Sequence, residues 1–209
     1  MTVSLQKGQS VSLAKKNNKY SNISINLKWN QNQSVEQPVK AKGFFGSLFG
    51  GSENNAPKGV DLDVGCLYEM KDGTKHVIQA LGNLFGSLTS APYIQLANDD
   101  RTGANKDGEF LTINGEHWDK IQRVLVFAYI YDGVPNWSQV DGIVHLKSDV
   151  SKFDIAMDNP VNGKNMCAIA LIENVNGEMK VTKLNDYYSG HEAMDRAHSW
   201  NMNWVKGSK

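Results

Sequence analysis

The sequence predicts an all-β protein: a two-sheet β-sandwich of about ten strands, with one long loop insertion and a short C-terminal helix or irregular tail. Three observations favour this fold class. Apolar residues recur at every second position, Gly, Asn and Asp separate the alternating segments, and helical spacing appears only near the C-terminus. The length of 209 residues suits a single domain over residues 1–209, since all-β sandwiches often use that length for one core.

The first strands are short. Residues 3–5 and 11–13 are apolar at alternate positions and flank a polar stretch containing Gly8, which predicts a hairpin or two separate short strands. In residues 21–29 Ile, Leu and Trp alternate with Ser, Asn and Lys, so one face of this strand can be buried.

Residues 60–68 and 124–131 predict two longer strands. In the first, the even positions are apolar, which puts Asp61 and Asp63 together on the opposite face, about 7 Å apart. The second is a nearly continuous apolar run that ends at Asp132, as expected of a central strand covered on both sides.

The clearest hairpin joins residues 166–175 to residues 178–184 through Asn176 and Gly177, the pair that best tolerates a type I′ turn. Residues 190–204 carry apolar side chains at three- and four-residue steps and predict a short helix. Weaker patterns predict further strands at 76–81, 93–97, 110–113, 143–146 and 152–157.

Residues 31–58 interrupt the pattern. They are rich in Gly, Asn, Gln and Ser, which predicts a long flexible insertion. Phe44, Phe45 and Phe49 within it could dock on a partner, on a membrane surface or on the protein's own flank, but a mobile loop with an apolar tip is the favoured interpretation.

Composition limits the partners and the compartment. Lys plus Arg is 22 and Asp plus Glu is 22, so no net charge recruits nucleic acid. Cys66 and Cys167 each lie in an apolar run, which favours buried free thiols over a zinc site or a nucleophile. The start of the chain lacks a secretory signal pattern, and no segment approaches the roughly 20 apolar residues of a membrane span, so we expect a cytoplasmic protein.

The segment 98–109 is the most informative for function. It offers four carboxylates, two Asn carbonyls, a Thr oxygen and two glycines within twelve residues. Calcium takes six to eight oxygen ligands in flexible geometry, and glycines let backbone carbonyls turn inward to complete the shell. The spacing loosely fits an EF-hand loop, but the flanking segments alternate like strands, which excludes the EF-hand fold. On composition alone, a solvated acidic turn remains an equal alternative.

Four blocks of sequence resemble the TerD-like family of bacterial tellurium-resistance and stress proteins, most closely its TerA-like branch. These blocks are residues 3–13, residues 61–63, residues 99–103 with 107–109, and residues 126–132 ahead of the C-terminal hairpin. The resemblance implies a β-sandwich that binds calcium at one end. It carries metal-ligand roles onto Asp61, Asp63, Asp99, Asp100, Asp107 and Glu109, with main-chain oxygens near Arg101 and Thr102 as helpers.

Two departures from the family loop concern a second calcium ion. Asp100 stands where the family usually has Asn, and Gly108 stands where a second Asp would fall, which puts the second of two possible sites in doubt. Asp132 aligns with a family Asp, and a role as ligand and a role as turn residue are equally supported.

Two other groups of residues could have either a functional or a structural role. The spacing of His191, Asp195 and His198 could place them on one helical face as a metal or acid-base site, although a surface helix with two histidines is favoured. The tryptophans could form a sugar- or protein-binding surface, although core or rim packing is favoured. The relevant positions are Trp118, Trp137, Trp200 and Trp204.

No Gly-rich phosphate loop, nucleophile elbow, zinc spacing or glycosidase carboxylate pair occurs in the sequence, so we expect no enzymatic activity. Two function classes remain. One is a calcium-dependent stress protein whose ion stabilises a docking surface for protein partners. The other is a carbohydrate- or protein-binding module without a metal requirement.

Overall fold

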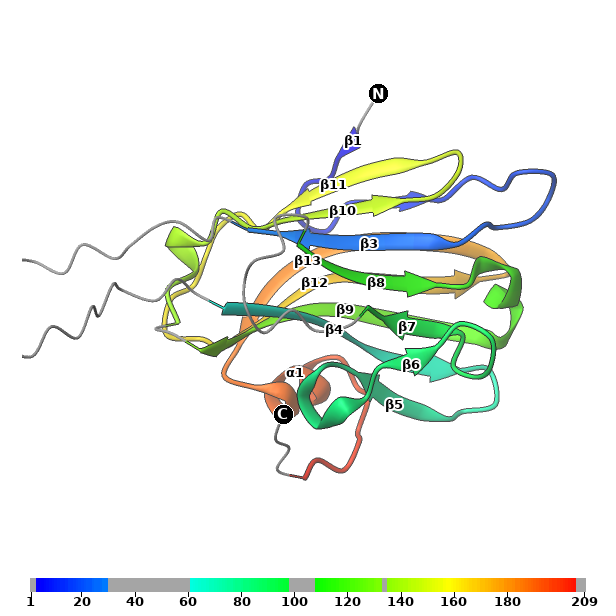
Figure 1. Cartoon of the computed structure of the whole chain (residues 1–209). Coiled ribbons are helices and arrows are strands. Elements are labelled where there is room, and N and C mark those ends of the chain that lie inside the picture. Colours follow the sequence, from blue (N-terminus) through cyan, green and yellow to red (C-terminus); the bar gives the residue numbers. More distant parts are fainter. Residues whose placement is uncertain (1–2, 30–60, 98–107, 133–134, 206–209) are drawn as a thin grey trace, which may run out of the picture.

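The computed structural model describes residues 3–29, 61–97, 108–132 and 135–205. They form an all-β sandwich, as the sequence predicts (Figure 1). Sheet A has seven strands in the order β1-β11-β10-β3-β8-β7-β6, and sheet B has six in the order β2-β13-β12-β9-β4-β5. The strands of sheet A are β1 (Val3–Ser4), β3 (Ile23–Lys28), β6 (Gly86–Ser87), β7 (Ile94–Leu96), β8 (Glu109–Ile113), β10 (Ile143–Lys147) and β11 (Lys152–Ala156). Those of sheet B are β2 (Ser10–Ser12), β4 (Asp61–Met70), β5 (Lys75–Ile78), β9 (Ile121–Asp132), β12 (Met166–Val175) and β13 (Glu178–Tyr188).

In the described ranges, three 3-10 helices and one α-helix accompany the strands. They are η1 (Leu81–Asn83), η2 (Gly115–Lys120), η3 (Trp137–Gln139) and α1 (His191–Ala197). The predicted C-terminal helix is confirmed. The strand predicted over residues 76–81 is wrong beyond Ile78, because Gly82 and Asn83 take φ angles of 78° and 57° in η1. Such left-handed conformations end an extended strand.

The N-terminal segment divides between the two sheets. β1 pairs in parallel with β11, whereas β2 pairs antiparallel with β13. Of the two predicted alternatives, two separate strands are therefore correct and the hairpin is not. The Asn176–Gly177 hairpin is confirmed, since both residues have positive φ, 53° and 85°, between the paired strands β12 and β13.

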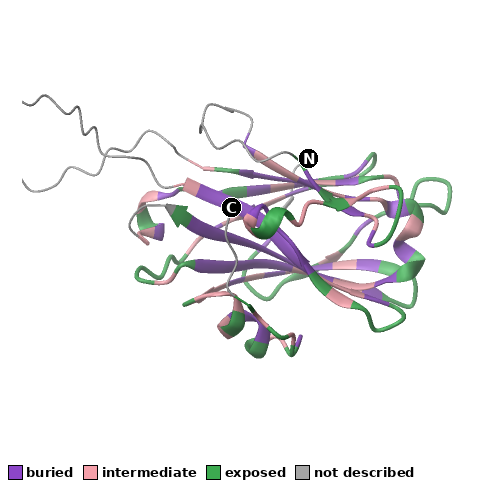
Figure 2. Ribbon diagram, turned by 60° about the horizontal axis from the view of Figure 1, so that its bottom comes forward, coloured by how far each residue is buried: buried purple, intermediate pink, exposed green. Residues whose placement is uncertain are grey.

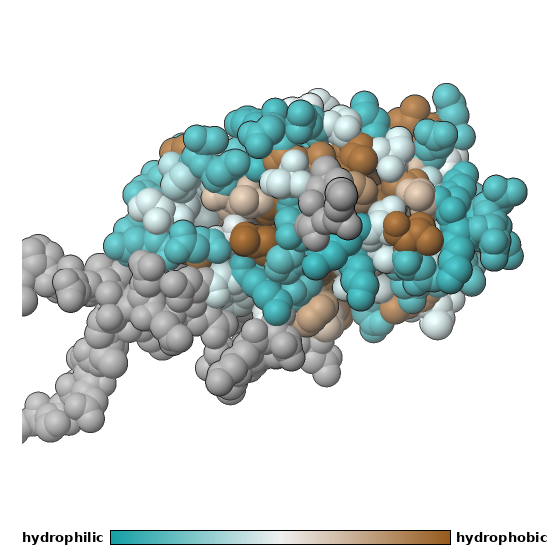
Figure 3. Space-filling model, turned by 90° about the horizontal axis from the view of Figure 1, so that it is seen from above, coloured by the Kyte–Doolittle hydropathy of each residue, from teal (hydrophilic) through white to brown (hydrophobic). Residues whose placement is uncertain are grey.

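The main core lies between the two sheets, where the alternating apolar side chains of both sheets meet. The buried residues follow the strands of both sheets (Figure 2). Seen from the side of β1 and β11, the surface is largely hydrophilic, with apolar side chains in separate spots (Figure 3).

A second core lies on the outer face of sheet B. It contains Leu67, Leu125 and Phe127 from the strands, together with Met194 and Trp200 from the chain after β13. We call residues 189–205 the C-terminal strap. Because the strap covers this face, β4 and β9 are buried on both sides, which explains the nearly continuous apolar run in residues 124–131.

Candidate functional site

The start of β4 carries two of the predicted metal ligands. Asp61 faces Asp132 across the ladder between β4 and β9, and Asp63 faces Tyr129. The register shifts between Asp61 and Leu62, so the strand is bulged at this point. Asp63 is only 1% exposed, which corrects the simple expectation of one wetted face for this strand. Two acidic residues are thus paired at the end of the β4–β9 ladder, and the buried Asp63 lies two positions further along β4.

Glu109, the first residue of β8, links this strand end to the other sheet. Its backbone pairs with Leu27 of β3 in sheet A, while its Oε2 accepts a hydrogen bond of 2.6 Å from the backbone N–H of Val64 in sheet B. Val64 directly follows Asp63. The structure therefore brings the end of the acidic segment 98–109 to the strand that carries Asp61 and Asp63.

The backbone at Gly108 explains one departure from the family loop. Gly108 has a φ of 81°, and a Cβ atom there would lie 2.1 Å from the carbonyl oxygen of Leu27. A side chain does not fit at that distance, and positive φ further disfavours residues other than glycine. An aspartate at position 108 is therefore incompatible with the approach that places Glu109 against Val64.

The structure locates some of the predicted ligands. Asp61 and Asp63 lie on β4, and the Glu109 carboxylate contacts the backbone of the same strand at Val64. The other predicted ligands, Asp99, Asp100, Arg101, Thr102 and Asp107, lie outside the described residues. Phe44, Phe45 and Phe49 of the insertion also lie outside them. Within the described ranges, no group of three or more His, Cys, Asp or Glu side chains is arranged to hold a metal ion by itself.

The chemistry of Asp61, Asp63 and Glu109 nevertheless suits a hard cation. All three offer carboxylate oxygens, the ligand type that calcium and magnesium prefer. Two carboxylates about 5 Å apart repel each other by about 3 kcal/mol at an effective dielectric constant of 20, so a cation among them would relieve a sizeable repulsion.

The two histidines of the C-terminal strap do not share a site. The Nε2 atom of His191 lies 2.7 Å from Oε1 of Gln79, and that of His198 lies 3.0 Å from the hydroxyl of Tyr188. Asp195, which is buried, accepts backbone hydrogen bonds from within the strap. The disfavoured alternative of a shared metal or acid-base site is therefore not formed. The favoured surface helix is present, but it buries Met194 and Asp195.

The remaining candidate residues are structural. Cys66 and Cys167 are buried free thiols, as predicted, and burial raises the pKa of each. Trp118, Trp137 and Trp200 are buried, which confirms that they pack in the interior.

A buried polar cluster at β13 was not predicted from the sequence. Lys183 on β13 is 1% exposed, and its Nζ atom lies 2.7 Å from Oδ2 of Asp158. Asn185, two residues further along β13, donates to Oδ1 of Asp158 at 2.7 Å and to the backbone carbonyl of Ala156 at 2.7 Å. A signal was present in the sequence, because Lys183 continues the alternation of the inward-facing Met179 and Val181.

Comparison with known proteins decides the family. The TerD domain model matches residues 1–185. The chain belongs to the TerD family. It is 43% identical over 209 residues to tellurium resistance protein TerA of Alcaligenes sp, an alignment that covers 99% of this chain and 58% of TerA. It is also 34% identical over 112 residues to tellurium resistance protein TerZ of Serratia marcescens, covering 54% of this chain and 50% of TerZ.

The resemblance to the TerA-like branch of the TerD family is thereby confirmed. The chain spans about half of the length of these curated relatives (58% and 50%). Among solved structures, a TerD homologue from Streptomyces coelicolor A3(2), SCO6318, aligns with a TM-score of 0.54 and 16% identity, over 84% of this chain and 95% of that one. This likeness concerns the TerD fold. In the part of the chain that the structure describes, no helix has the length and apolarity of a membrane span.

Proposed function

We propose that this TerD-family chain is a non-catalytic, calcium-binding protein of the tellurium-resistance stress response. A calcium ion would join the segment 99–109 to the start of β4 at one end of the sandwich. The ordered end would then present a docking surface to protein partners in the cytoplasm. The relatives TerA and TerZ are named as tellurium resistance proteins, which supports a role in tellurium resistance. The two free buried thiols suit a reducing compartment such as the cytoplasm.

One observation carries the calcium proposal: the hydrogen bond between Oε2 of Glu109 and the backbone of Val64. It brings the end of the acidic segment to the residue that follows Asp63, although Glu109 and Val64 are 45 residues apart in sequence. Asp61 and Asp132, two acidic residues, are paired at the same end of the β4–β9 ladder. Like charges directly opposite each other on a ladder are destabilising, and a divalent cation would turn this repulsion into attraction.

The first test is a thermal-unfolding titration with calcium. Ligand that binds only the folded state stabilises it by RT ln(1 + [Ca]/Kd), about 2.7 kcal/mol at 100 times Kd. For a chain of this size we expect Tm to rise by about 5–10 °C, at about 2–4 °C per kcal/mol. Chelator should reverse the rise. Magnesium should give a much smaller one, because it requires a rigid octahedron and keeps its waters.

A response to calcium that magnesium matches fully would contradict the proposed loop geometry. No response to calcium at all would favour the alternative function, a carbohydrate- or protein-binding module without a metal. Because Trp118, Trp137 and Trp200 are buried, that module would have to recognise its ligand through other residues.

The second test removes ligands without removing the contact to Val64. In the double variant Asp99→Ala/Glu109→Gln, the glutamine keeps an oxygen that can accept from the Val64 N–H but loses the negative charge. We expect the calcium-dependent rise in Tm to vanish while the fold without calcium is kept. Far-UV circular dichroism and calorimetric calcium titration measure the two effects.

The matched control neutralises two carboxylates at the opposite end of the sandwich, Glu116→Gln/Asp119→Asn, both in η2. This control should keep the full calcium response. If Asp99→Ala/Glu109→Gln binds calcium as tightly as the unmodified chain, these two residues are not ligands.

A further inference from the structure

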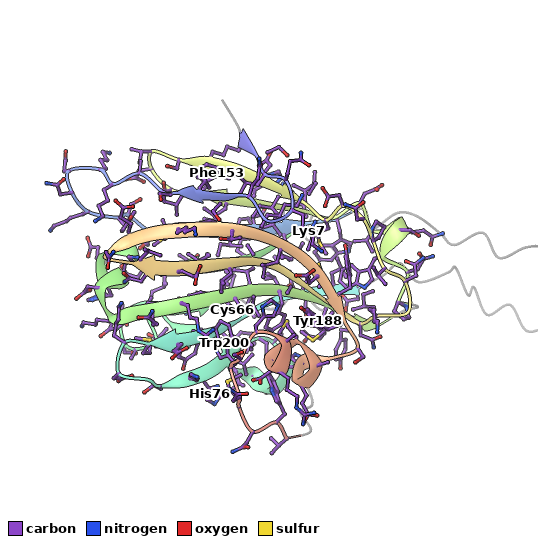
Figure 4. The ribbon with its side chains drawn as sticks, turned by 180° about the vertical axis from the view of Figure 1, so that it is seen from behind. Lys7, Cys66, His76, Phe153, Tyr188 and Trp200 are labelled. Carbon is purple, nitrogen blue, oxygen red and sulfur yellow. The ribbon has the colours of Figure 1, made fainter. Side chains whose placement is uncertain are left out.

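The C-terminal strap is a distinct layer on the outer face of sheet B. The TerD domain match ends at residue 185, near the end of β13, whereas the strap follows it and runs back across the sheet. Viewed from the side of sheet B, Trp200 lies over the strands near Cys66 of β4, with Tyr188 at one flank and His76 at the other (Figure 4). The face beneath the strap is strongly apolar.

Arg123 of β9 anchors the far end of the strap. Its Nε atom donates to Glu69 at 2.6 Å, and its two terminal nitrogens donate to the backbone carbonyls of His198 and Ser199, each at 3.1 Å. The guanidinium group also stacks on the ring of Trp200, 3.8 Å from the ring centroid. A planar cation that makes all these contacts holds the strap by its backbone as well as by its side chain.

Asp195 stabilises the conformation of the strap through hydrogen bonds to its backbone. Its two carboxylate oxygens accept the backbone N–H groups of Asn201 at 2.8 Å and Met202 at 3.1 Å. These bonds fix the turn of the chain after α1.

His191 packs at the other end of the strap, inside an aromatic enclosure. Its ring centroid lies 5.5 Å from that of Phe127, 5.5 Å from that of Tyr129 and 5.0 Å from that of Trp204. Its Nε2 atom bonds to the side chain of Gln79. The ring is half-buried, and the loss of solvation that remains favours the neutral imidazole over an imidazolium in the docked position.

We propose that the C-terminal strap is an acid-sensitive latch: residues 189–205 cover the apolar outer face of sheet B at neutral pH and release it when His191 takes up a proton. Release would expose an apolar surface formed by Leu67, Leu125 and Phe127, with the sandwich itself still folded. The latch requires no bound calcium ion, although Asp63, one of the proposed ligands, lies opposite Tyr129 on the ladder.

The direction of the pH effect follows from proton linkage. Desolvation by burial lowers the pKa of His191 from 6.5 to about 4 in the docked state. A histidine whose pKa is lowered by docking favours the docked state fully above its ordinary pKa and opposes it as the pH falls below that value. With these two pKa values, the opening equilibrium constant should rise about 30-fold between pH 7.5 and pH 5.

The charged groups around His191 leave this direction unchanged. Gln79, Phe127 and Trp204 carry no charge, and Tyr129 is neutral over this pH range. On the helix itself, Glu192 pairs with Arg196, and Asp195 is engaged by backbone N–H groups. Asp63 lies opposite Tyr129 on the ladder, and burial alone accounts for the lowered pKa of His191. Burial also lowers the pKa of His198, with Arg123 acting in the same direction and Asp186 against it.

The experiment is amide hydrogen exchange of the full chain from pH 7.5 to pH 5 in chelator, corrected for the intrinsic pH dependence of exchange. We expect exchange in residues 191–204 to accelerate about 30-fold beyond that correction, while β3 and β10 stay protected. Binding of a dye that reports exposed apolar surface should rise over the same pH range.

His191→Phe is the decisive variant, because it keeps an aromatic ring in the enclosure and cannot be protonated. Its strap should stay closed at pH 5. His191→Gln, a smaller and polar replacement, gives the same test if the phenylalanine variant folds poorly. The matched control is His145→Gln, which removes a histidine of sheet A paired with Asp154 and should open like the unmodified chain.

Three results would overturn the latch. The strap could stay protected at pH 5, both sheets could lose protection together with it, or the His191 variants could open as readily as the unmodified chain. Because the measurements are made in chelator, none of these results bears on the calcium proposal.

Discussion

Replacing Trp200 by alanine should lower the free energy of unfolding by about 3–5 kcal/mol, the usual cost of removing a buried tryptophan. Trp200 is 1% exposed and is among the largest side chains in the second core. The substitution removes the surface on which the Arg123 guanidinium stacks and the hydrogen bond from Nε1 to the backbone carbonyl of Tyr68. Urea denaturation monitored by far-UV circular dichroism measures this loss.

Trp204→Ala is the matched control, because Trp204 belongs to the same strap but is partly exposed. We expect a clearly smaller loss there, about 1–2 kcal/mol. If Trp200→Ala changed the free energy of unfolding by less than about 1 kcal/mol, the packing of Trp200 in the second core would not stabilise the fold.

Replacing Asp158 by alanine should cost about 2–4 kcal/mol of folding free energy. The substitution leaves the Lys183 ammonium, which is 1% exposed, without its carboxylate. Breaking a fully buried pair costs about 3–5 kcal/mol, and the value is lower here because the Asp158 side chain is 40% exposed and partly screened by water. Chemical denaturation of the variant checks this figure.

Lys183→Met supplies the control for this ion pair. An apolar side chain of similar length removes the buried charge, so Lys183→Met combined with Asp158→Ala should recover most of the loss. An additive double variant, as unstable as the sum of the two single ones, would contradict the coupling.

The loss of folding free energy caused by Asp158→Ala should also depend on pH. Burial raises the pKa of Asp158, but the hydrogen bonds from Lys183 and Asn185 outweigh it and leave the pKa lowered. A carboxyl group with a lowered folded pKa stabilises the fold above its ordinary pKa and loses this contribution as the pH falls through the folded pKa. The difference between Asp158→Ala and the unmodified chain should therefore shrink in acid.

Local sequence patterns predict most strands of this fold. Alternation in residues 21–29 and 166–184 leads to β3 and to the β12–β13 hairpin, because one face of each strand meets the inter-sheet core. The pattern fails in residues 76–81, where a left-handed turn follows Ile78. It also misses the two-residue strand β6, which is too short to show a period.

Contacts between distant residues could not be predicted in the same way. The hydrogen bond between Glu109 and Val64 and the anchoring of the strap by Arg123 join positions far apart in sequence, and no periodicity encodes such a meeting. The family resemblance supplied the grouping of Asp61, Asp63 and Glu109. The structure adds the physical reason for Gly108, which is a close backbone approach and not a choice of ligand.

The split of the N-terminal strands between the two sheets bears on the order in which the protein assembles. Val3 of β1 pairs with Phe153, and Val11 of β2 pairs with Val181, so each strand closes the edge of its sheet with a partner synthesised much later. Until residues 153–181 leave the ribosome, residues 3–12 have no strand to join. Contacts of such long sequence separation slow folding, and strands that wait unpaired invite aggregation. The outer edges of the two sheets can therefore both be complete only after the last hairpin has been synthesised.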